Sequence, residues 1–290
     1  YKSYKQLLLI TDDIIKYIID NYTAEAGVRK LKEIIFEIMS EINLQLLNDD
    51  NIILPVKLTE SLIKDIYLKK RHPILPKNIH DISSPGLING LWANALGKGG
   101  IIQIESQFIL SQKMLEMKLT GMQGDVMKES MAVAKSLAWK LTPDDRKAKI
   151  LTDFEKTKQQ GIHVHCPEGA VPKDGPSAGT AITTCVYSLL NDIPIKNDLA
   201  ITGEMNLQGK VTIIGGLDLK ILGGITAGVK TFLFPKENQR DFDDFMEEWG
   251  EKDLVKGINV KDSKYITETL VTHKSSNTCK IVTREDTIKT

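Results

Sequence analysis

Apolar residues recur with helical spacing over the first quarter of the chain. Between residues 28 and 46 they follow one another at steps of three and four, which places them on one face of a long helix. These residues are Val28, Leu31, Ile35, Ile38, Ile42 and Leu46. Thr23 is a candidate cap for this helix, and shorter helices are expected after Thr11 and Thr59. The pattern predicts a small all-α helical bundle over residues 1–75.

The helical period stops at a segment rich in proline. The stretch "HPILPKNIHDISSPG" contains three prolines and a Ser-Ser-Pro-Gly turn signal. We therefore expect residues 76–85 to link the bundle to a second domain.

Strand and helix patterns alternate in the rest of the chain. Strands are expected at residues 99–110, 115–121, 161–165, 199–204, 210–216 and 231–235, and helices at 124–141, 177–190, 217–227 and in an acidic segment ending at Trp249. No regular repeat runs through them, so residues 86–272 are predicted to form an α+β (α/β-like) domain with mixed sheets and packed helices. Residues 273–290 are polar and aperiodic, and a disordered tail is expected there.

Composition and charge exclude several classes of protein. The chain has 290 residues, of which 41% are hydrophobic and 26% charged, as in globular proteins that do not span membranes. Its 38 basic and 38 acidic residues cancel, so nucleic acid and anionic membranes are not indicated as partners, and no apolar run is long enough to span a bilayer. Cys166, Cys185 and Cys279 are far apart, which argues against a metal site or a disulfide framework. We expect a protein without a signal peptide in an intracellular compartment, in the first place the cytoplasm.

One serine lies where a loop enters a helix. In "PKDGPSAGTA", Ser177 follows a Gly-Pro turn at the expected start of helix 177–190. A serine in a first helical turn is usually a cap, but the free backbone N–H groups there also suit a nucleophile, since they stabilise an oxyanion. Gly175 and Gly179 leave room for a substrate backbone. The spacing alone is a weak signal.

A serine nucleophile needs a base, and two kinds of candidate remain from the residues alone. His163 and His165 alternate on a strand and so share one face. Lys220 lies at the edge of an apolar helical stripe, beside Gly216 and Gly224. A lysine acts as a base near neutral pH only if desolvation lowers its pKa by about 3 units from about 10.4.

Three long segments decide between these candidates by resemblance. "HVHCPEGAVPKDGPSAGTA", "ITGEMNLQGKV" and "IGGLDLKILGGITAGVKTFLFPKEN" closely resemble the proteolytic domain of the Lon family of ATP-dependent proteases, over residues 85–250. The resemblance implies a catalytic dyad of Ser177 and Lys220, with Thr202 orienting the lysine amine, and returns both histidines to a structural role. Asp174 is a candidate to pair with Lys220 in an inactive arrangement, because a nearby carboxylate raises the pKa of an amine.

The N-terminal bundle resembles another part of the same family. "NYTAEAGVRKLKEII" is similar to the sensor-2 region of the helical subdomain of the Lon AAA+ module, which implies that Arg29 reaches a bound nucleotide. No phosphate-binding G-x-x-x-x-G-K-[ST] motif occurs in the chain. We therefore expect the C-terminal piece of a longer protease, one that needs ATP and Mg²⁺ as a whole but no cofactor for peptide cleavage by this chain.

The resemblance also implies partners, and two other function classes stay open. Lon-type proteases are expected to form homohexameric rings and to degrade unfolded, misfolded or regulatory proteins. One alternative is a Lon-like ring scaffold without proteolysis, which would be expected to lack the serine or the lysine. The other is a phosphate or nucleotide binder at residues 175–180, which Asp174 opposes by its charge. Glu105 and Glu129 lie in similar segments, and spacing assigns them no chemistry.

Overall fold

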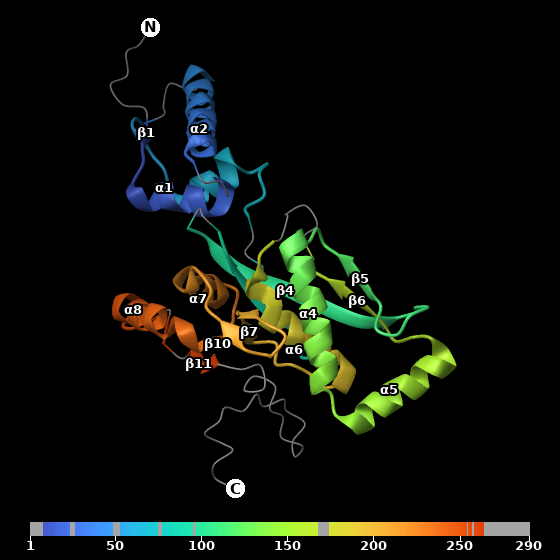
Figure 1. Cartoon of the computed structure of the whole chain (residues 1–290). Coiled ribbons are helices and arrows are strands. Elements are labelled where there is room, and N and C mark those ends of the chain that lie inside the picture. Colours follow the sequence, from blue (N-terminus) through green and yellow to red (C-terminus); the bar gives the residue numbers. More distant parts are fainter. Residues whose placement is uncertain are drawn as a thin grey trace. The chain divides into compact units, whose positions relative to one another are not determined.

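The computed structural model describes residues 8–23, 27–48, 53–74, 77–94, 97–167, 174–253, 255–256 and 258–263. The chain divides into two compact units, Tyr1–Pro76 and Lys77–Thr290 (Figure 1). The predicted tail at residues 273–290 lies outside the described residues.

The N-terminal unit is built from helices around one apolar core. Its elements are β1 (Leu8–Leu9), α1 (Asp12–Ile18), the π-helical turn η1 (Ile19–Thr23), α2 (Arg29–Asn48), β2 (Val56–Lys57), α3 (Glu60–Leu62) and the π-helical turn η2 (Ile63–Tyr67). The short strands β1 and β2 pair in parallel. Ile34, Ile38 and Ile42 of α2 are fully buried in the core, together with Ile18 and Ile63.

Two details of this unit differ from the sequence prediction. The helix begins at Arg29, so Val28 lies outside it and is 72% exposed, and the fully buried row runs through Ile34 instead of Ile35. The predicted cap at Thr23 is wrong, because Thr23 belongs to η1 and its hydroxyl donates to the Ile19 carbonyl. The helix expected after Thr59 is present as α3, and the Thr59 hydroxyl caps it by accepting from the Leu62 amide at 3.3 Å.

A mixed sheet forms the centre of the C-terminal unit, which confirms the α+β class. Its strands are β3 (Leu87–Ala93), β4 (Gly99–Ile109), β5 (Met117–Thr120), β6 (Gly161–His165), β7 (Leu199–Ile201), β10 (Thr231–Pro235) and β11 (Asn259–Ser263). They lie in the order β11-β10-β7-β3-β4-β6-β5. The pairs β3–β4 and β4–β6 are antiparallel, and the other pairs are parallel.

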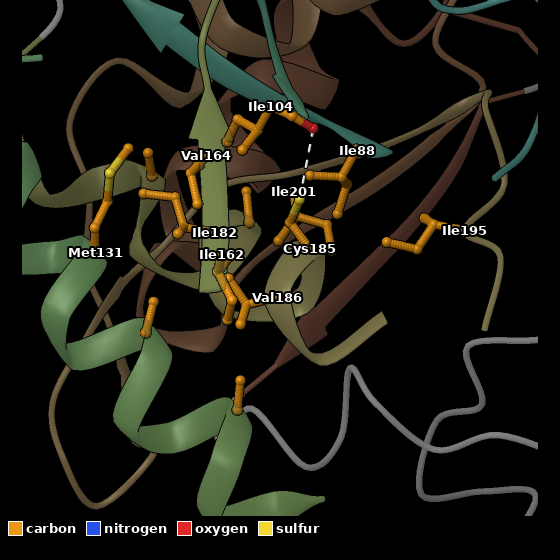
Figure 2. Packing of buried hydrophobic residues seen from close by; sticks show 14 of the residues in the cluster. Ile88, Ile104, Met131, Ile162, Val164, Ile182, Cys185, Val186, Ile195 and Ile201 are labelled. Carbon is orange, nitrogen blue, oxygen red and sulfur yellow. Dashed lines mark hydrogen bonds between the residues drawn. The ribbon is translucent and has the colours of Figure 1, made fainter. Parts of the chain in front are cut away.

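Helices cover both faces of this sheet (Figure 1). They are α4 (Asp125–Leu141), α5 (Asp144–Thr157), α6 (Gly179–Asn191), α7 (Leu217–Thr226) and α8 (Gln239–Trp249). The helices α4 and α6 share one core with every second residue of β4 and β6, and α7 and α8 share another core with residues of the opposite face, such as Leu91 and Ile101. Figure 2 shows the first core, in which Met131 and Ile182 face Ile162 and Val164.

Cys185 is part of that core and has a structural environment. Its thiol is fully buried and has the carbonyl oxygens of Gly86 and Ile104 within hydrogen-bond distance as acceptors, the contact to Ile104 being drawn as a dashed line in Figure 2. Burial raises the pKa of the Cys185 thiol to about 12. The thiol is therefore inert at neutral pH.

The helix α7 approaches β4 closely through glycine. A β-carbon at Gly99 would overlap the carbonyl of Leu219, and one at Gly223 would overlap the backbone of Gly99. The absence of side chains at both positions lets the two backbones touch. This contact fixes the helix that carries Lys220.

The C-terminal unit also contains four short elements. They are the 3₁₀ turns η3 (Pro176–Ala178) and η4 (Lys236–Asn238) and the strands β8 (Glu204–Met205) and β9 (Val211–Thr212). The β8–β9 hairpin turns through Gly209, with φ of 81°. The strand expected at 210–216 ends early, at Thr212.

Candidate active site

The structure brings Ser177 and Lys220 to the same cleft. The cleft has a volume of about 320 Å³ and is lined by Trp92, Ala93, Asp174, Pro176, Ser177, Glu204, Ile213, Ile214, Gly215 and Lys220. Three of the residues singled out from the sequence thus meet here, whereas His163 and His165 are not among its lining residues.

Hydrogen bonds attach the serine backbone to the segment that follows β7. The Ser177 carbonyl accepts from the Gly203 amide at 2.8 Å and from the Thr202 hydroxyl at 3.3 Å. The Thr180 amide returns a bond to the Gly203 carbonyl at 3.0 Å. The Ser177 hydroxyl caps neither η3 nor α6, and within the described residues it makes no hydrogen bond. It is available to a substrate.

Lys220 is buried to an unusual degree for a lysine. It is 3% exposed, and its amine donates to the Thr202 hydroxyl at 3.3 Å. Desolvation by burial lowers the pKa of Lys220 to about 8. About a tenth of such amines is neutral at pH 7, compared with a few in ten thousand for an ordinary lysine. The amine can therefore serve as a base near neutral pH.

Thr202 connects the two residues. Its hydroxyl accepts from the Lys220 amine and donates to the Ser177 carbonyl, so one side chain contacts both partners of the predicted dyad. Thr202 is 1% exposed, and its backbone is held by β10, because the Thr202 amide donates to the Leu233 carbonyl at 3.0 Å. A buried hydroxyl that takes part in two hydrogen bonds has a defined orientation.

Asp174 lies at the cleft but bonds to a different element. Its Oδ1 atom accepts from the Met127 amide at 3.0 Å and from the Gly175 amide at 2.9 Å, and so caps the first turn of α4. Gly124 makes room for it, because a β-carbon there would lie 2.5 and 2.6 Å from the two carboxylate oxygens. In the part of the chain that the structure describes, no ion pair joins Asp174 to Lys220. Their pairing stays a prediction for another arrangement of the loop.

The two histidines contribute to the sheet. The ring nitrogens His163 Nε2 and His165 Nδ1 lie 2.8 and 2.7 Å from the Thr120 hydroxyl on the neighbouring strand β5. Desolvation, and next the charge of Lys118, lower the pKa of His163. Both side chains thus bond within the sheet and do not line the cleft.

Arg29 lies in the N-terminal unit as the first residue of α2. Its side chain is 85% exposed and pairs with Glu33 at 3.0 Å. An exposed pair of this kind is worth about 0–1 kcal/mol, so it holds the guanidinium only weakly. The role of Arg29 toward a nucleotide stays a prediction.

The described residues contain neither a candidate metal cluster nor a candidate membrane span. No group of three or more His, Cys, Asp or Glu side chains is placed to hold a metal ion in the described ranges. Among the helices that the structure describes, none has both the length and the apolar character needed to cross a bilayer.

Sequence reasoning missed the apolar residues of the cleft. Trp92 is 39% exposed and Ile213 is 56% exposed, and both line the cleft. Trp92 lies on β3, which was not predicted, and Ile213 lies beyond the point where β9 ends. A large apolar residue that packs into no core is the signal that marks both.

Comparisons with known proteins agree with these segments. A family model described as the Lon protease (S16) C-terminal proteolytic domain matches residues 57–272, and one described as the Lon protease AAA+ ATPase lid domain matches residues 4–52. A Lon protease of Methanosphaera stadtmanae is 39% identical over 239 residues, which cover 82% of this chain and 27% of that protein. A Lon protease of Campylobacter concisus is 37% identical over 254 residues, which cover 82% of this chain and 31% of that protein. The chain thus spans about three tenths of the length of these curated relatives.

Proposed function

Because the chain belongs to the Lon protease family, we propose that it is the proteolytic part of an ATP-dependent serine endopeptidase with a Ser177–Lys220 dyad. One observation carries this proposal: Lys220, with its lowered pKa, shares a cleft with Ser177, whose hydroxyl makes no hydrogen bond within the described residues. Thr202 bonds to both, which keeps the amine near the serine.

The proposed mechanism begins with neutral Lys220. Its amine takes the proton of the Ser177 hydroxyl while the serine oxygen attacks the carbonyl carbon of a peptide bond. Backbone N–H groups at the entrance of α6 stabilise the negative oxygen of the tetrahedral intermediate. The intermediate collapses to an acyl-enzyme as the Lys220 ammonium returns its proton to the leaving amine. Water then attacks the ester carbonyl while Lys220 accepts a water proton, and Lys220 passes this proton to the serine oxygen as the bond to the acyl product breaks.

Thr202 and Asp174 have supporting roles in this proposal. Thr202 orients the lone pair of the neutral amine by fixing one of its N–H groups. Asp174 bonds to α4 and, in the part of the chain that the structure describes, forms no ion pair with Lys220, which keeps the amine easier to deprotonate.

For the longer protein the proposal includes the family's other properties. ATP and Mg²⁺ would bind to parts outside this chain, with Arg29 contacting the nucleotide, whereas peptide cleavage by this chain needs no cofactor. The whole protein would form a homohexamer and degrade unfolded, misfolded or regulatory proteins inside the cell, as part of protein quality control.

Hydrolysis of a short fluorogenic peptide tests the dyad. The purified chain is compared with Ser177→Ala and Lys220→Ala over a range of protein concentrations, and with Ser130→Ala and Lys230→Ala as controls outside the cleft. We expect cleavage to disappear in the first two variants and to persist in the controls. Cleavage that survives Ser177→Ala would contradict the dyad, and an inactive unmutated chain at every concentration would favour the ring scaffold.

A further inference from the structure

One wall of the cleft is a short segment that belongs to no helix or strand of the described residues. The strand β9 ends at Thr212, yet residues 213–215 continue along the cleft and line it. Ile214 is 7% exposed, so its backbone N–H and C=O groups need partners other than water.

A single side chain supplies both partners. The Asn238 Oδ1 atom accepts from the Ile214 amide at 3.0 Å, and its Nδ2 atom donates to the Ile214 carbonyl at 2.8 Å. A carboxamide offers the same donor and acceptor as a peptide group, so Asn238 replaces the missing neighbouring strand at this residue. Asn238 is fully buried, and a further bond from its Nδ2 atom to Asp241 fixes the orientation of the amide.

The preceding residue of η4 adds a second connection. Glu237 accepts from the Ile213 amide through Oε2 at 3.1 Å, and its Oε1 atom pairs with Lys210 of the β8–β9 hairpin at 2.8 Å. Three hydrogen bonds to side chains of η4, one to Glu237 and two to Asn238, thus hold the backbone of Ile213 and Ile214.

These bonds determine which side chain the wall presents to the cleft. With the Ile214 side chain buried, Ile213 points the other way and remains 56% exposed. An extended peptide lying in the cleft would meet this apolar side chain. Neither Asn238 nor Glu237 lines the cleft itself, so both act through the segment they hold.

We propose that Asn238, assisted by Glu237, is a positioning residue that holds the wall at residues 213–215 for an extended peptide substrate. This inference rests on the proposed function and extends it to substrate binding. Lys220 depends on Asn238 much less, because the contact of α7 with β4 at Gly99 and Gly223 fixes its helix. The proposal therefore predicts a change in KM that is larger than the change in kcat.

The test uses two variants and a matched control in the full chain. Asn238→Ala removes the buried amide, and Glu237→Ala removes an exposed side chain and is expected to fold normally. Asn89→Ala is the control, because Asn89 is 1% exposed and donates to the carbonyls of Asn197 and Leu199, away from the cleft. Peptide kinetics and amide hydrogen exchange at Ile213 and Ile214 are measured for each.

We expect Asn238→Ala to raise KM by about tenfold with kcat within about threefold, and Glu237→Ala to raise KM by about threefold. The apparent pKa of cleavage should not move in either variant. Exchange should accelerate at Ile214 in Asn238→Ala and at Ile213 in Glu237→Ala, while Asn89→Ala changes neither exchange nor KM.

The two readouts separate this inference from the proposed function. Unchanged exchange at Ile213 and Ile214 would overturn the positioning role whether or not the chain cleaves peptide. If exchange accelerates but KM stays at the value of Asn89→Ala, the bonds are structural only and the inference fails. If the unmutated chain cleaves no peptide, the proposed function fails, and accelerated exchange would still support the part of the inference that concerns the wall.

Discussion

Replacing Lys220 by methionine should stabilise the protein at neutral pH. Lys220 is 3% exposed, and desolvation lowers its pKa from 10.5 to about 8. Between these two values the unfolded chain binds more protons at this position than the folded chain does, so the contribution of Lys220 to stability rises with pH through this window. Methionine has a similar length and no titratable group, so position 220 adds no pH dependence to the free energy of unfolding of the Lys220→Met variant.

The size of the effect follows from the shift. A pKa difference of this size corresponds to about 3 kcal/mol of unfavourable free energy at pH 7, where the lysine must be deprotonated or buried as an ammonium. At pH 10 the unfolded lysine has begun to lose its own proton, and less than about 1 kcal/mol remains. The hydrogen bond to Thr202 is lost at both pH values and cancels in the comparison.

Urea unfolding followed by tryptophan fluorescence provides the assay. All three tryptophans, Trp92, Trp139 and Trp249, lie in the C-terminal unit, so the signal reports the unit that contains Lys220. We expect the gain from Lys220→Met to be about 2 kcal/mol larger at pH 7 than at pH 10. As a control, Lys230→Met at an exposed position should stay within about 0.5 kcal/mol of the unmutated chain. An equal effect of Lys220→Met at both pH values would refute the lowered pKa.

Three further predictions concern activity. The rate of peptide cleavage should rise about tenfold between pH 7 and pH 9, because the proposed mechanism begins with the neutral amine of Lys220, and a flat profile would contradict this. Thr202→Val should lower kcat by about ten- to a hundredfold, since it removes the hydroxyl between Lys220 and Ser177; an unchanged kcat would exclude that role. Asp174→Asn should raise peptidase activity, because asparagine still accepts from the α4 amide but cannot pair with the lysine. Gly124→Ala should lower peptidase activity, because the added β-carbon would displace the Asp174 carboxylate from α4 and leave it free to pair with Lys220. If both variants raise activity or both lower it, Asp174 does not alternate between α4 and Lys220.

The sequence predicted those elements whose apolar residues are periodic. Helix α7 has a buried stripe at Leu217 and Ile221, and both its type and its start were predicted. Helix α5 (Asp144–Thr157) was missed, because Ile150 is its one buried residue and most of the other residues in the segment are charged or polar. A helix that contacts the core through a single residue has no periodic signal.

The site was less accessible to pattern reasoning than the fold. Spacing left histidines and lysine open as bases, and family resemblance decided between them. The burial of Lys220 depends on the contact of α7 with β4, which connects residues more than a hundred positions apart in the chain. The bond from the Met127 amide to Asp174 and the role of Asn238 likewise join segments that no local pattern relates.

The glycine contact between α7 and β4 also limits how this sequence can evolve. Gly99 and Gly223 face each other without a side chain on either side, so no neighbour can shrink to compensate for an added methyl group. A larger residue at either position requires the whole helix to move, and that movement would carry the lysine away from Thr202. A single substitution at Gly99 or Gly223 is therefore expected to disturb the site. An engineering library that varies the cleft should keep both glycines while it diversifies Trp92 and Ile213.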